Sequence, residues 1–181
     1  MELNKPEYYA PMEVTLLNEE PLADFTIRTF RLRKRFSVGP ASLAERAMGL
    51  HTSAQDKEGR IVYQFQYYQW HIHACPFTNS LLQFRRRVRV YMEEMVPKEP
   101  EPGPVIVHCS DGCARTGTYM AIDANLELCE EDNAFDIFNY VRKMRIARRG
   151  MVESVDQYKF IYLCLEEAYV SGTCSLHTVN V

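Results

Sequence analysis

The residues best suited to chemistry lie in one segment, His108 to Gly117, which reads HCSDGCARTG. Cys109 precedes Arg115 by six positions, and Thr116 follows the arginine directly. A loop of small residues that leads into a helix directs backbone N–H groups and the helix dipole at one point, which suits an oxyanion. Arg115 adds a planar guanidinium that can grip two phosphate oxygens. The segment therefore predicts an anion-binding loop.

The same positive field favours the thiolate form of Cys109, because N–H dipoles and a guanidinium lower the pKa of a nearby thiol. A thiolate is a nucleophile near neutral pH, and the Thr116 hydroxyl can hydrogen-bond it or help it leave a phosphorus centre. The alternative is a structural cysteine in a tight turn, which leaves the apolar run before the loop and the Thr-Gly after Arg115 unexplained. We expect the anion to be surrounded by the small residues between the cysteine and the arginine, namely Ser110, Asp111, Gly112, Cys113 and Ala114.

This segment resembles the signature loop of the classical protein tyrosine phosphatases, whose pattern is H-C-S-x-G-x-G-R-[ST]-G. Segments similar to others of the family follow in the family's order, at 23–30 (ADFTIRTF), 64–70 (QFQYYQW) and 151–161 (MVESVDQYKFI). The resemblance extends from about residue 8 to residue 170, and the family's N-terminal portion, with the loop that stacks on the phosphotyrosine ring, has no counterpart. It implies Cys109 as nucleophile, Arg115 as phosphate clamp and no metal or other cofactor.

The acid loop departs from the pattern of active members. In the family this loop supplies an aspartic acid that protonates the leaving phenolate, and alignment on Trp70 and Pro76 places Ile72 at that position. Losing a general acid typically costs ~10²–10⁴ in rate. His71 and His73 remain as substitute acids, because imidazole titrates near neutrality. His71 and His73 have the H-x-H spacing of some metal ligands, but the sequence offers no third ligand near them, so we expect no metal site there.

Two further departures add negative charge to the site. The fourth signature residue, usually small, is Asp111, whose carboxylate repels a phosphate dianion and opposes thiolate formation at Cys109. The alternative is that this side chain points outward and caps a nearby helix. Glu153 stands where the resemblance places a water-positioning glutamine, whereas Gln157 matches the family's other glutamine.

These departures predict a tyrosine-phosphatase-like domain that is inactive or strongly impaired. It resembles the second domains of receptor phosphatases or inactive receptor members, which implies a role in signalling through a phosphotyrosine protein or another phosphatase domain. The alternative is an active cysteine-dependent phosphatase that hydrolyses phosphotyrosine through a phosphocysteine intermediate, with a substitute acid.

Apolar periodicity predicts the elements that position these residues. Alternation predicts strands at 13–17, 25–32 and 60–68 with a turn at 18–24, and the VIV run at 105–107 predicts a strand buried on both faces. Helical spacing predicts helices at 78–94, 115–128, 134–146 and 154–169. The expected fold is α/β in the broad sense, a mixed α+β sheet flanked by helices, with a C-terminal helical bundle.

Length and composition limit the remaining possibilities. The 181 residues suit one domain, with a long connection or insertion at 34–59 and a tail at 171–181. A net charge of −3 argues against nucleic-acid binding, and no apolar run approaches the ~18 residues of a membrane span. Six cysteines without framework spacing favour a reducing, cytoplasmic setting, with Cys129 and Cys164 as buried free thiols.

Two basic stretches stand out, at 85–89 (RRRVR) and at 142–149 (RKMRIARR). A solvated helix face is the expected role of the first, and a site for acidic partners or phosphoinositides is the alternative. The acidic residues at 127–132 are the expected counterpart of the second.

Overall fold

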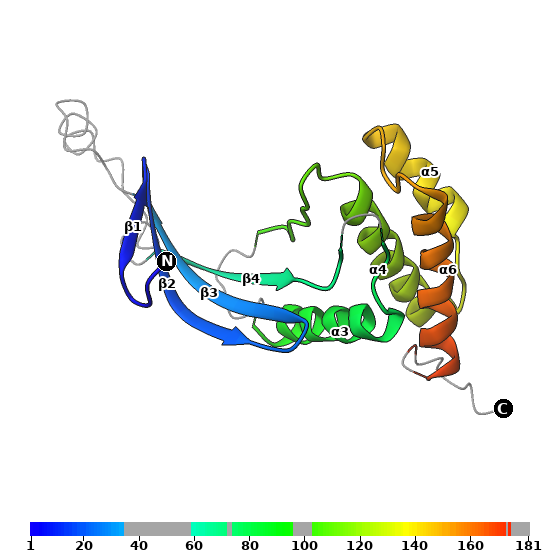
Figure 1. Cartoon of the computed structure of the whole chain (residues 1–181), viewed down its shortest axis with the longest axis horizontal. Helices are drawn as coiled ribbons and strands as arrows, with labels where there is room; N and C mark the ends of the chain where they lie inside the picture. The colour runs from blue at the N-terminus through cyan, green and yellow to red at the C-terminus, as the bar shows by residue number, and fades with distance from the viewer. Residues whose placement is uncertain (35–58, 72–73, 96–102, 173, 175–181) are drawn as a thin grey trace. The chain divides into compact units, whose positions relative to one another are not determined.

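The computed structural model describes residues 1–34, 59–71, 74–95, 103–172 and 174. The chain forms two compact units, Met1–Gln69 and Trp70–Val181. The first contains a β-sheet, and the second contains the helices and the segment with Cys109 (Figure 1). The α+β class expected from the sequence is therefore confirmed. Most of the predicted connection and tail, at 35–58, 173 and 175–181, lies outside the described residues.

The first unit is a four-stranded antiparallel sheet in the order β1-β2-β3-β4. Its strands are β1 (Pro6–Tyr9), β2 (Met12–Pro21), β3 (Phe25–Lys34) and β4 (Arg60–Tyr67). The three predicted strands are confirmed, and β1 was not predicted. The predicted turn at 18–24 is too long, because the register shifts between Leu16 and Asn18 and pairing then continues to Pro21.

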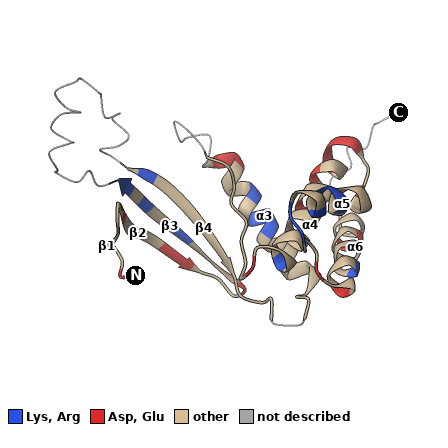
Figure 2. Cartoon of the chain, turned by 90° about the horizontal axis from the view of Figure 1, so that it is seen from above, with Lys and Arg blue, Asp and Glu red and all other residues tan. Residues whose placement is uncertain are grey.

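A polar cluster on the sheet explains why β2 continues past the shift. Glu19 pairs with Arg28 across β2 and β3, and the Arg28 Nε lies 2.6 Å from the Glu19 carboxylate. The same guanidinium donates to Gln66 of β4 at 2.6 Å, so that one arginine connects three strands. In Figure 2 the ribbon of β2 carries acidic positions in red, and that of β3 carries basic positions in blue.

The second unit contains four described helices: α3 (Thr78–Glu94), α4 (Ala114–Asp132), α5 (Ile137–Ala147) and α6 (Val155–Val170). Helix α4 packs against α5 and α6, and α3 packs against α6. Their common core contains Ile122, Leu126, Ile161 and the buried free thiols Cys129 and Cys164, as predicted. Every helix in the described ranges is too short or too polar to cross a bilayer.

The ends of these helices follow their capping residues. Helix α5 begins three residues later than predicted, because the Asp136 side chain accepts the Asn139 N–H and so caps the first turn. Helix α6 begins with a capping box, in which Ser154 and Gln157 each accept from the other's backbone N–H.

The predicted strand at 105–107 is wrong. This segment has no strand structure, and the side chains of Val105 and Ile106 are 57% and 82% exposed. A short apolar run becomes a buried strand only when other strands complete its hydrogen bonds. Within the described residues the sheet consists of β1 to β4 alone and is antiparallel throughout, so the run has no strand partner.

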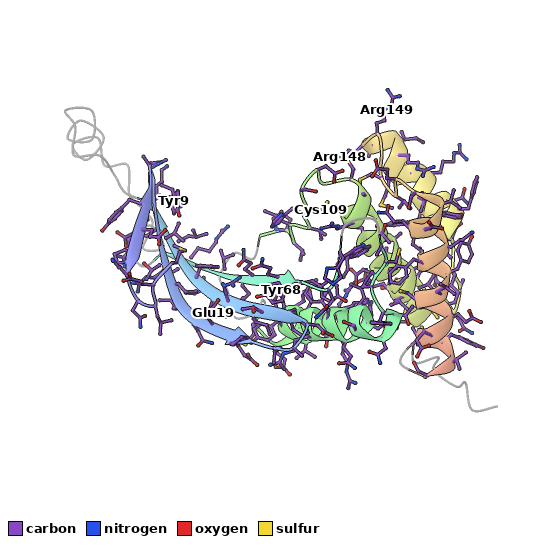
Figure 3. All side chains as sticks on the ribbon, viewed as in Figure 1. Tyr9, Glu19, Tyr68, Cys109, Arg148 and Arg149 are labelled. Carbon is purple, nitrogen blue, oxygen red and sulfur yellow. The ribbon has the colours of Figure 1, made fainter. Side chains whose placement is uncertain are left out.

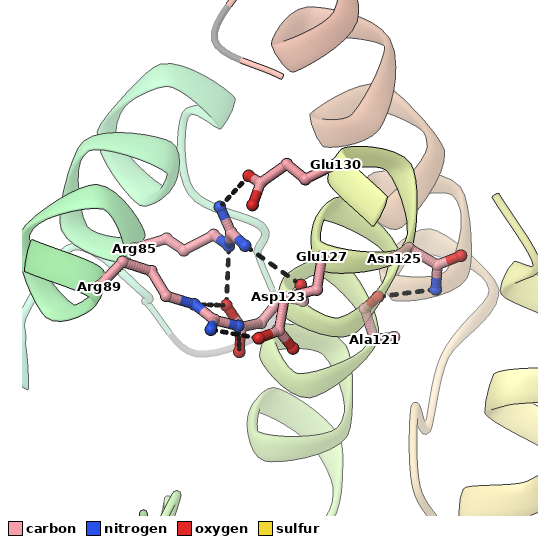
Figure 4. A network of polar contacts seen from close by, with 7 residues as sticks. All are labelled: Arg85, Arg89, Ala121, Asp123, Asn125, Glu127 and Glu130. Carbon is pink, nitrogen blue, oxygen red and sulfur yellow. Dashed lines mark hydrogen bonds and ion pairs between the residues drawn. The ribbon is translucent and has the colours of Figure 1, made fainter. Parts of the chain in front are cut away.

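The predicted solvated face at 85–89 is also wrong for two of its arginines. Arg85 is only 8% exposed, and its Nε lies 2.7 Å from Asp123 of α4. Arg89 lies one turn further along α3, and its guanidinium pairs with the same carboxylate at 2.8 Å and with Glu127 (Figure 4). Residues four apart share a helix face, so both arginines face α4. Glu127 and Glu130 therefore form ion pairs with α3, whereas the sequence led us to expect them to pair with the basic stretch at 142–149.

Candidate active site

The segment around Cys109 is a short loop that ends in a helix. Residues 103–109 lack regular structure, and α4 starts at Ala114 with Cys113 at its N-cap position. Gly112 has φ +69, a backbone conformation that glycine adopts without steric cost, and it turns the chain into the helix. The loop therefore leads into a helix N-terminus, where the first N–H groups have no carbonyl partners within the helix.

Gly117 fixes the helix against the segment before α6. A Cβ on Gly117 would lie 2.7 Å from the backbone nitrogen of Val152, which is closer than Cβ atoms in proteins approach other heavy atoms. The Gly117 N–H also donates to the Cys113 carbonyl at 2.8 Å. The glycine after Arg115 and Thr116 thus permits close contact between α4 and residues 151–152.

The Cys109 sulfur has two hydrogen-bond partners with opposite effects. The Thr116 Oγ1 donates to Sγ at 3.1 Å, and Sγ donates to Asp111 Oδ1 at 3.1 Å. Partial burial and the Asp111 carboxylate raise the pKa of the thiol. The Thr116 hydroxyl and the backbone at residues 116 and 111 lower it, and the pKa ends below its ordinary value. The contacts of the sulfur thus lower the Cys109 pKa, and the Asp111 carboxylate opposes this shift.

The Asp111 carboxylate lies within the loop. Besides the Cys109 contact, its Oδ1 accepts the Cys113 backbone N–H at 2.9 Å. The hydrogen bonds from Cys109 and then from Cys113 hold the pKa of this carboxyl below its usual range, so it is ionised at neutral pH. The side chain is exposed, and the N–H that it accepts belongs to Cys113, the N-cap residue of α4. It takes a backbone donor next to the cysteine and places a negative charge there.

Arg148 is a loop contact that sequence reasoning missed. It follows α5 and donates from one terminal nitrogen to the Asp111 carbonyl at 3.0 Å and from Nε to the Cys113 sulfur at 3.3 Å. The hydrogen bond to Cys113 is the main cause that raises the pKa of Arg148 above its ordinary value. Figure 3 shows Arg148 beside the loop that carries Cys109. Its place in a basic run was visible in the sequence, but nothing in the sequence indicated contact with a loop 35 residues earlier.

Arg115, the second residue of α4, has a different environment. Across the described ranges, no protein group forms a hydrogen bond or ion pair with its guanidinium. Its donors therefore remain available for an external anion. This arginine is the expected phosphate clamp.

The remaining predicted site residues lie apart from these contacts. The Gln157 side-chain oxygen accepts the N–H groups of Glu153 at 3.0 Å and Ser154 at 3.4 Å, so in this structure it caps α6. The Glu153 side chain is exposed. Trp70, at the start of the acid loop, packs edge-to-face on Phe160 with 5.9 Å between ring centroids.

The acid loop itself is described only in part. Ile72 and His73 lie outside the described residues, and His71 is exposed.

Comparisons with known proteins agree with the resemblance seen in the sequence. The model of the family described as protein-tyrosine phosphatase matches residues 1–167. Receptor-type tyrosine-protein phosphatase S of Gallus gallus is 36% identical over 174 residues, which cover 96% of this chain and 10% of that protein. Receptor-type tyrosine-protein phosphatase F is 35% identical over 176 residues in Danio rerio and 36% identical over 176 residues in Bos taurus. Each match to phosphatase F covers 97% of this chain and 8% of the relative.

The chain thus spans about a tenth of the length of these relatives. The family model and the relatives together confirm the expected family. The chain belongs to the protein-tyrosine phosphatase family.

Proposed function

We propose that this domain is a pseudophosphatase, a tyrosine-phosphatase domain that is inactive or strongly impaired and acts in signalling by binding a partner. The observation that carries the proposal is the position of the Asp111 carboxylate, 3.1 Å from the Cys109 sulfur and 2.9 Å from the Cys113 backbone nitrogen. A phosphate group bound in front of α4 needs the same donors. The Asp111 carboxylate would therefore compete with a bound phosphate for these donors, which supports the proposal.

This carboxylate opposes two steps of phosphate hydrolysis. A dianionic substrate that approaches Cys109 meets a negative charge, which weakens its binding. A sulfur that donates its proton to Asp111 is a thiol, and a thiol is a poor nucleophile. Both effects come from one residue type at one position of the signature.

The acid loop adds a third obstacle, argued from sequence alone. Ile72, outside the described residues, stands where active members carry the acid that protonates the leaving phenolate. Without that proton the leaving group departs as a phenolate anion, and the rate falls by ~10²–10⁴.

The proposed partners are a phosphotyrosine protein or another phosphatase domain. The relatives are receptor-type phosphatases, and the chain matches a small part of each of them. Arg115, without a protein partner among the described residues, supports weak affinity for a phosphorylated ligand. A cytoplasmic setting is part of the proposal, since all six cysteines are free thiols and disulfides are rare in reducing compartments.

A second candidate function is an active cysteine-dependent phosphatase. One observation favours it, because the pKa of Cys109 lies below its ordinary value in spite of Asp111. In that case His71 or His73 supplies the proton.

Hydrolysis of p-nitrophenyl phosphate separates the two functions. The Cys109→Ser variant serves as the blank, and thermal unfolding shows that each variant is folded. We expect no turnover by the wild-type chain above this blank. We expect partial recovery in the double variant Ile72→Asp, Asp111→Ala, which restores the acid and removes the competing charge. Wild-type turnover clearly above the blank would reject the pseudophosphatase.

A further inference from the structure

The basic stretch at 142–149 lacks the acidic counterpart that the sequence suggested for it. Glutamates of α4 form ion pairs with α3 instead. Across the described ranges, no protein group forms a hydrogen bond or ion pair with the side chains of Arg142, Lys143 and Arg149. All three residues are exposed. These cations therefore remain available for an anionic partner outside the chain.

The other two arginines of the stretch have acceptors within the protein. The Arg145 guanidinium donates to the carbonyls of Met151 at 2.9 Å and Val152 at 2.6 Å. Carbonyl acceptors leave the positive charge in place, so Arg145 adds to the positive potential at this end of α5. Arg148 supports the loop before α4, where the Asp111 carboxylate offsets part of its charge.

Two large apolar side chains lie on the same face of α5 as Arg142. Phe138 and Ile146 are 65% and 77% exposed. Residues four apart share a helix face, so Phe138, Arg142 and Ile146 form one stripe along the helix. The buried side of the helix has its own apolar residues, namely Ile137, Val141 and Met144. Helix α5 therefore presents apolar side chains to solvent as well as to the core.

This combination fits an anionic lipid surface better than a protein partner. Apolar and basic side chains that alternate on one exposed helix face are typical of helices that lie on a membrane. The apolar groups enter the boundary between headgroups and acyl chains, and the basic groups attract anionic lipids. A side chain as exposed as Ile146 protrudes from the surface. A protein would need a matching pocket for it, whereas a bilayer takes up a protruding apolar group without one.

We propose that the α5 face, made up of Phe138, Arg142, Lys143, Ile146 and Arg149, docks onto an anionic lipid bilayer. The two apolar side chains insert below the headgroups, and the three unpaired cations lie against the anionic headgroups. The helix lies on the surface and does not cross the bilayer. This inference goes beyond the pseudophosphatase, because it uses none of the residues that surround the Cys109 sulfur.

The net charge of −3 orients the chain on the bilayer and does not prevent docking. Charges in about 0.15 M salt interact over about 8 Å, so the bilayer attracts the cations that face it, and acidic residues further away contribute little. Figure 3 shows the Arg149 side chain pointing away from the ribbon at the end of α5. The chain therefore binds with the end of α5 toward the lipid.

Co-sedimentation of the whole chain with lipid vesicles tests the proposal. One set of vesicles consists of phosphatidylcholine, and the other contains phosphatidylserine in addition. We expect the wild-type chain to sediment with the phosphatidylserine vesicles and to stay in solution with phosphatidylcholine alone. High salt should release it, because salt screens the attraction between the cations and the headgroups.

The double variant Arg142→Gln, Arg149→Gln removes two of the unpaired cations. Each lysine or arginine near an anionic surface strengthens binding roughly fivefold, so we expect binding to phosphatidylserine vesicles to weaken about 10- to 30-fold. The matched control is Arg86→Gln, Lys159→Gln, which changes the net charge equally at exposed positions of α3 and α6. Its binding should stay within about twofold of the wild type.

The variant Ile146→Ser tests insertion of the apolar side chains. We expect vesicle binding to weaken about three- to tenfold, because a serine loses the gain from moving an apolar side chain out of water. The matched control is Val170→Ser, at a side chain of α6 that is also 77% exposed. It should bind as the wild type does. Thermal unfolding shows that each variant is folded.

Wild-type behaviour alone can overturn the proposal, if the chain binds neither kind of vesicle or binds both equally. Equal losses in the two double variants would also overturn it, because total charge and not the α5 face would then govern binding. Unchanged binding of Ile146→Ser would reject the insertion.

Light scattering tests the other occupant of this face, a second copy of the chain. Wild-type dimers that Arg142→Gln, Arg149→Gln converts to monomers, without vesicle binding by either, would assign the face to a second copy and overturn the proposal. These measurements require no phosphate turnover. The docking and the pseudophosphatase therefore succeed or fail separately.

Discussion

The Asp111 carboxylate lies 3.1 Å from the Cys109 sulfur, the same distance at which the Thr116 hydroxyl contacts that sulfur from α4. One neighbour keeps the proton on sulfur and the other favours its loss. Cys109, the proposed nucleophile, therefore has a counteracting charge in its own loop, and we expect its reactivity to depend on the balance between two hydrogen bonds.

Replacing Asp111 with alanine should increase the reactivity of Cys109. The Asp111 carboxylate raises the pKa of the thiol, so its removal lowers that pKa and increases the thiolate fraction at neutral pH. We expect alkylation of Cys109 by iodoacetamide at pH 7 to be roughly threefold to tenfold faster, since one pKa unit changes the thiolate fraction about tenfold. The midpoint of the pH profile should move to lower pH. Peptide mass spectrometry measures both.

Asp156→Ala is the matched control, because it removes an exposed carboxylate in the first turn of α6. Its Cys109 alkylation should equal that of the wild type. An Asp111→Ala variant that is alkylated no faster than this control would show that the carboxylate does not restrain the thiol.

Replacing Gly117 with alanine should destabilise the second unit. The added Cβ would lie 2.7 Å from the Val152 nitrogen and 3.2 Å from the Met151 Cα, both backbone atoms that cannot rotate away. We expect a loss of about 1–3 kcal/mol in urea unfolding, typical of overpacking, in spite of the ~1 kcal/mol that alanine gains over glycine in a helix.

Gly172→Ala separates crowding from backbone strain. A Cβ there meets no atom within 4 Å, but φ is +68. A loss of at most about 1 kcal/mol is expected from strain alone. Equal losses in the two variants would argue against a close contact between α4 and residues 151–152.

Replacing Asp123 with alanine should weaken the joint between α3 and α4. Its carboxylate pairs with Arg85 at 2.7 Å and with Arg89 at 2.8 Å, and Arg85 is buried. Removing one partner leaves a buried guanidinium with fewer acceptors, so we expect a loss of about 2–4 kcal/mol in urea unfolding. Glu131→Ala, an exposed change on the same helix, should stay within about 0.5 kcal/mol of the wild type. A similarly small loss for Asp123→Ala would show that its ion pairs with Arg85 and Arg89 do not stabilise the contact between α3 and α4.

Local patterns were sufficient to predict the described helices and β2 to β4. Helix α3 has its predicted bounds, and the apolar spacing of α4 and α6 matches the faces that they bury. Strand β1 has only four residues and begins with proline, so no periodicity was visible. Val105 to Val107 has a strand-like composition, but whether a strand forms depends on partners far away in the chain.

The site shows the same division between near and distant contacts. Cys109, Asp111 and Thr116 are neighbours in sequence, so their proximity followed from a loop that enters a helix. Contacts between residues far apart in the chain could not be predicted in this way. Arg148 reaches the loop from the end of α5, and Arg85 reaches Asp123 from another helix. A run of basic residues in the sequence shows where positive charge lies, but not which distant groups the side chains contact.

The contacts of Arg148 mean that the signature segment is not a self-contained module. Its shape depends on a side chain 37 positions beyond Asp111, which holds that residue's carbonyl. If residues 108–117 were transplanted into another scaffold without the terminus of α5, the graft would lack this support and relax. Natural variation at Arg148 would likewise change the shape of the signature segment without altering any of its ten residues.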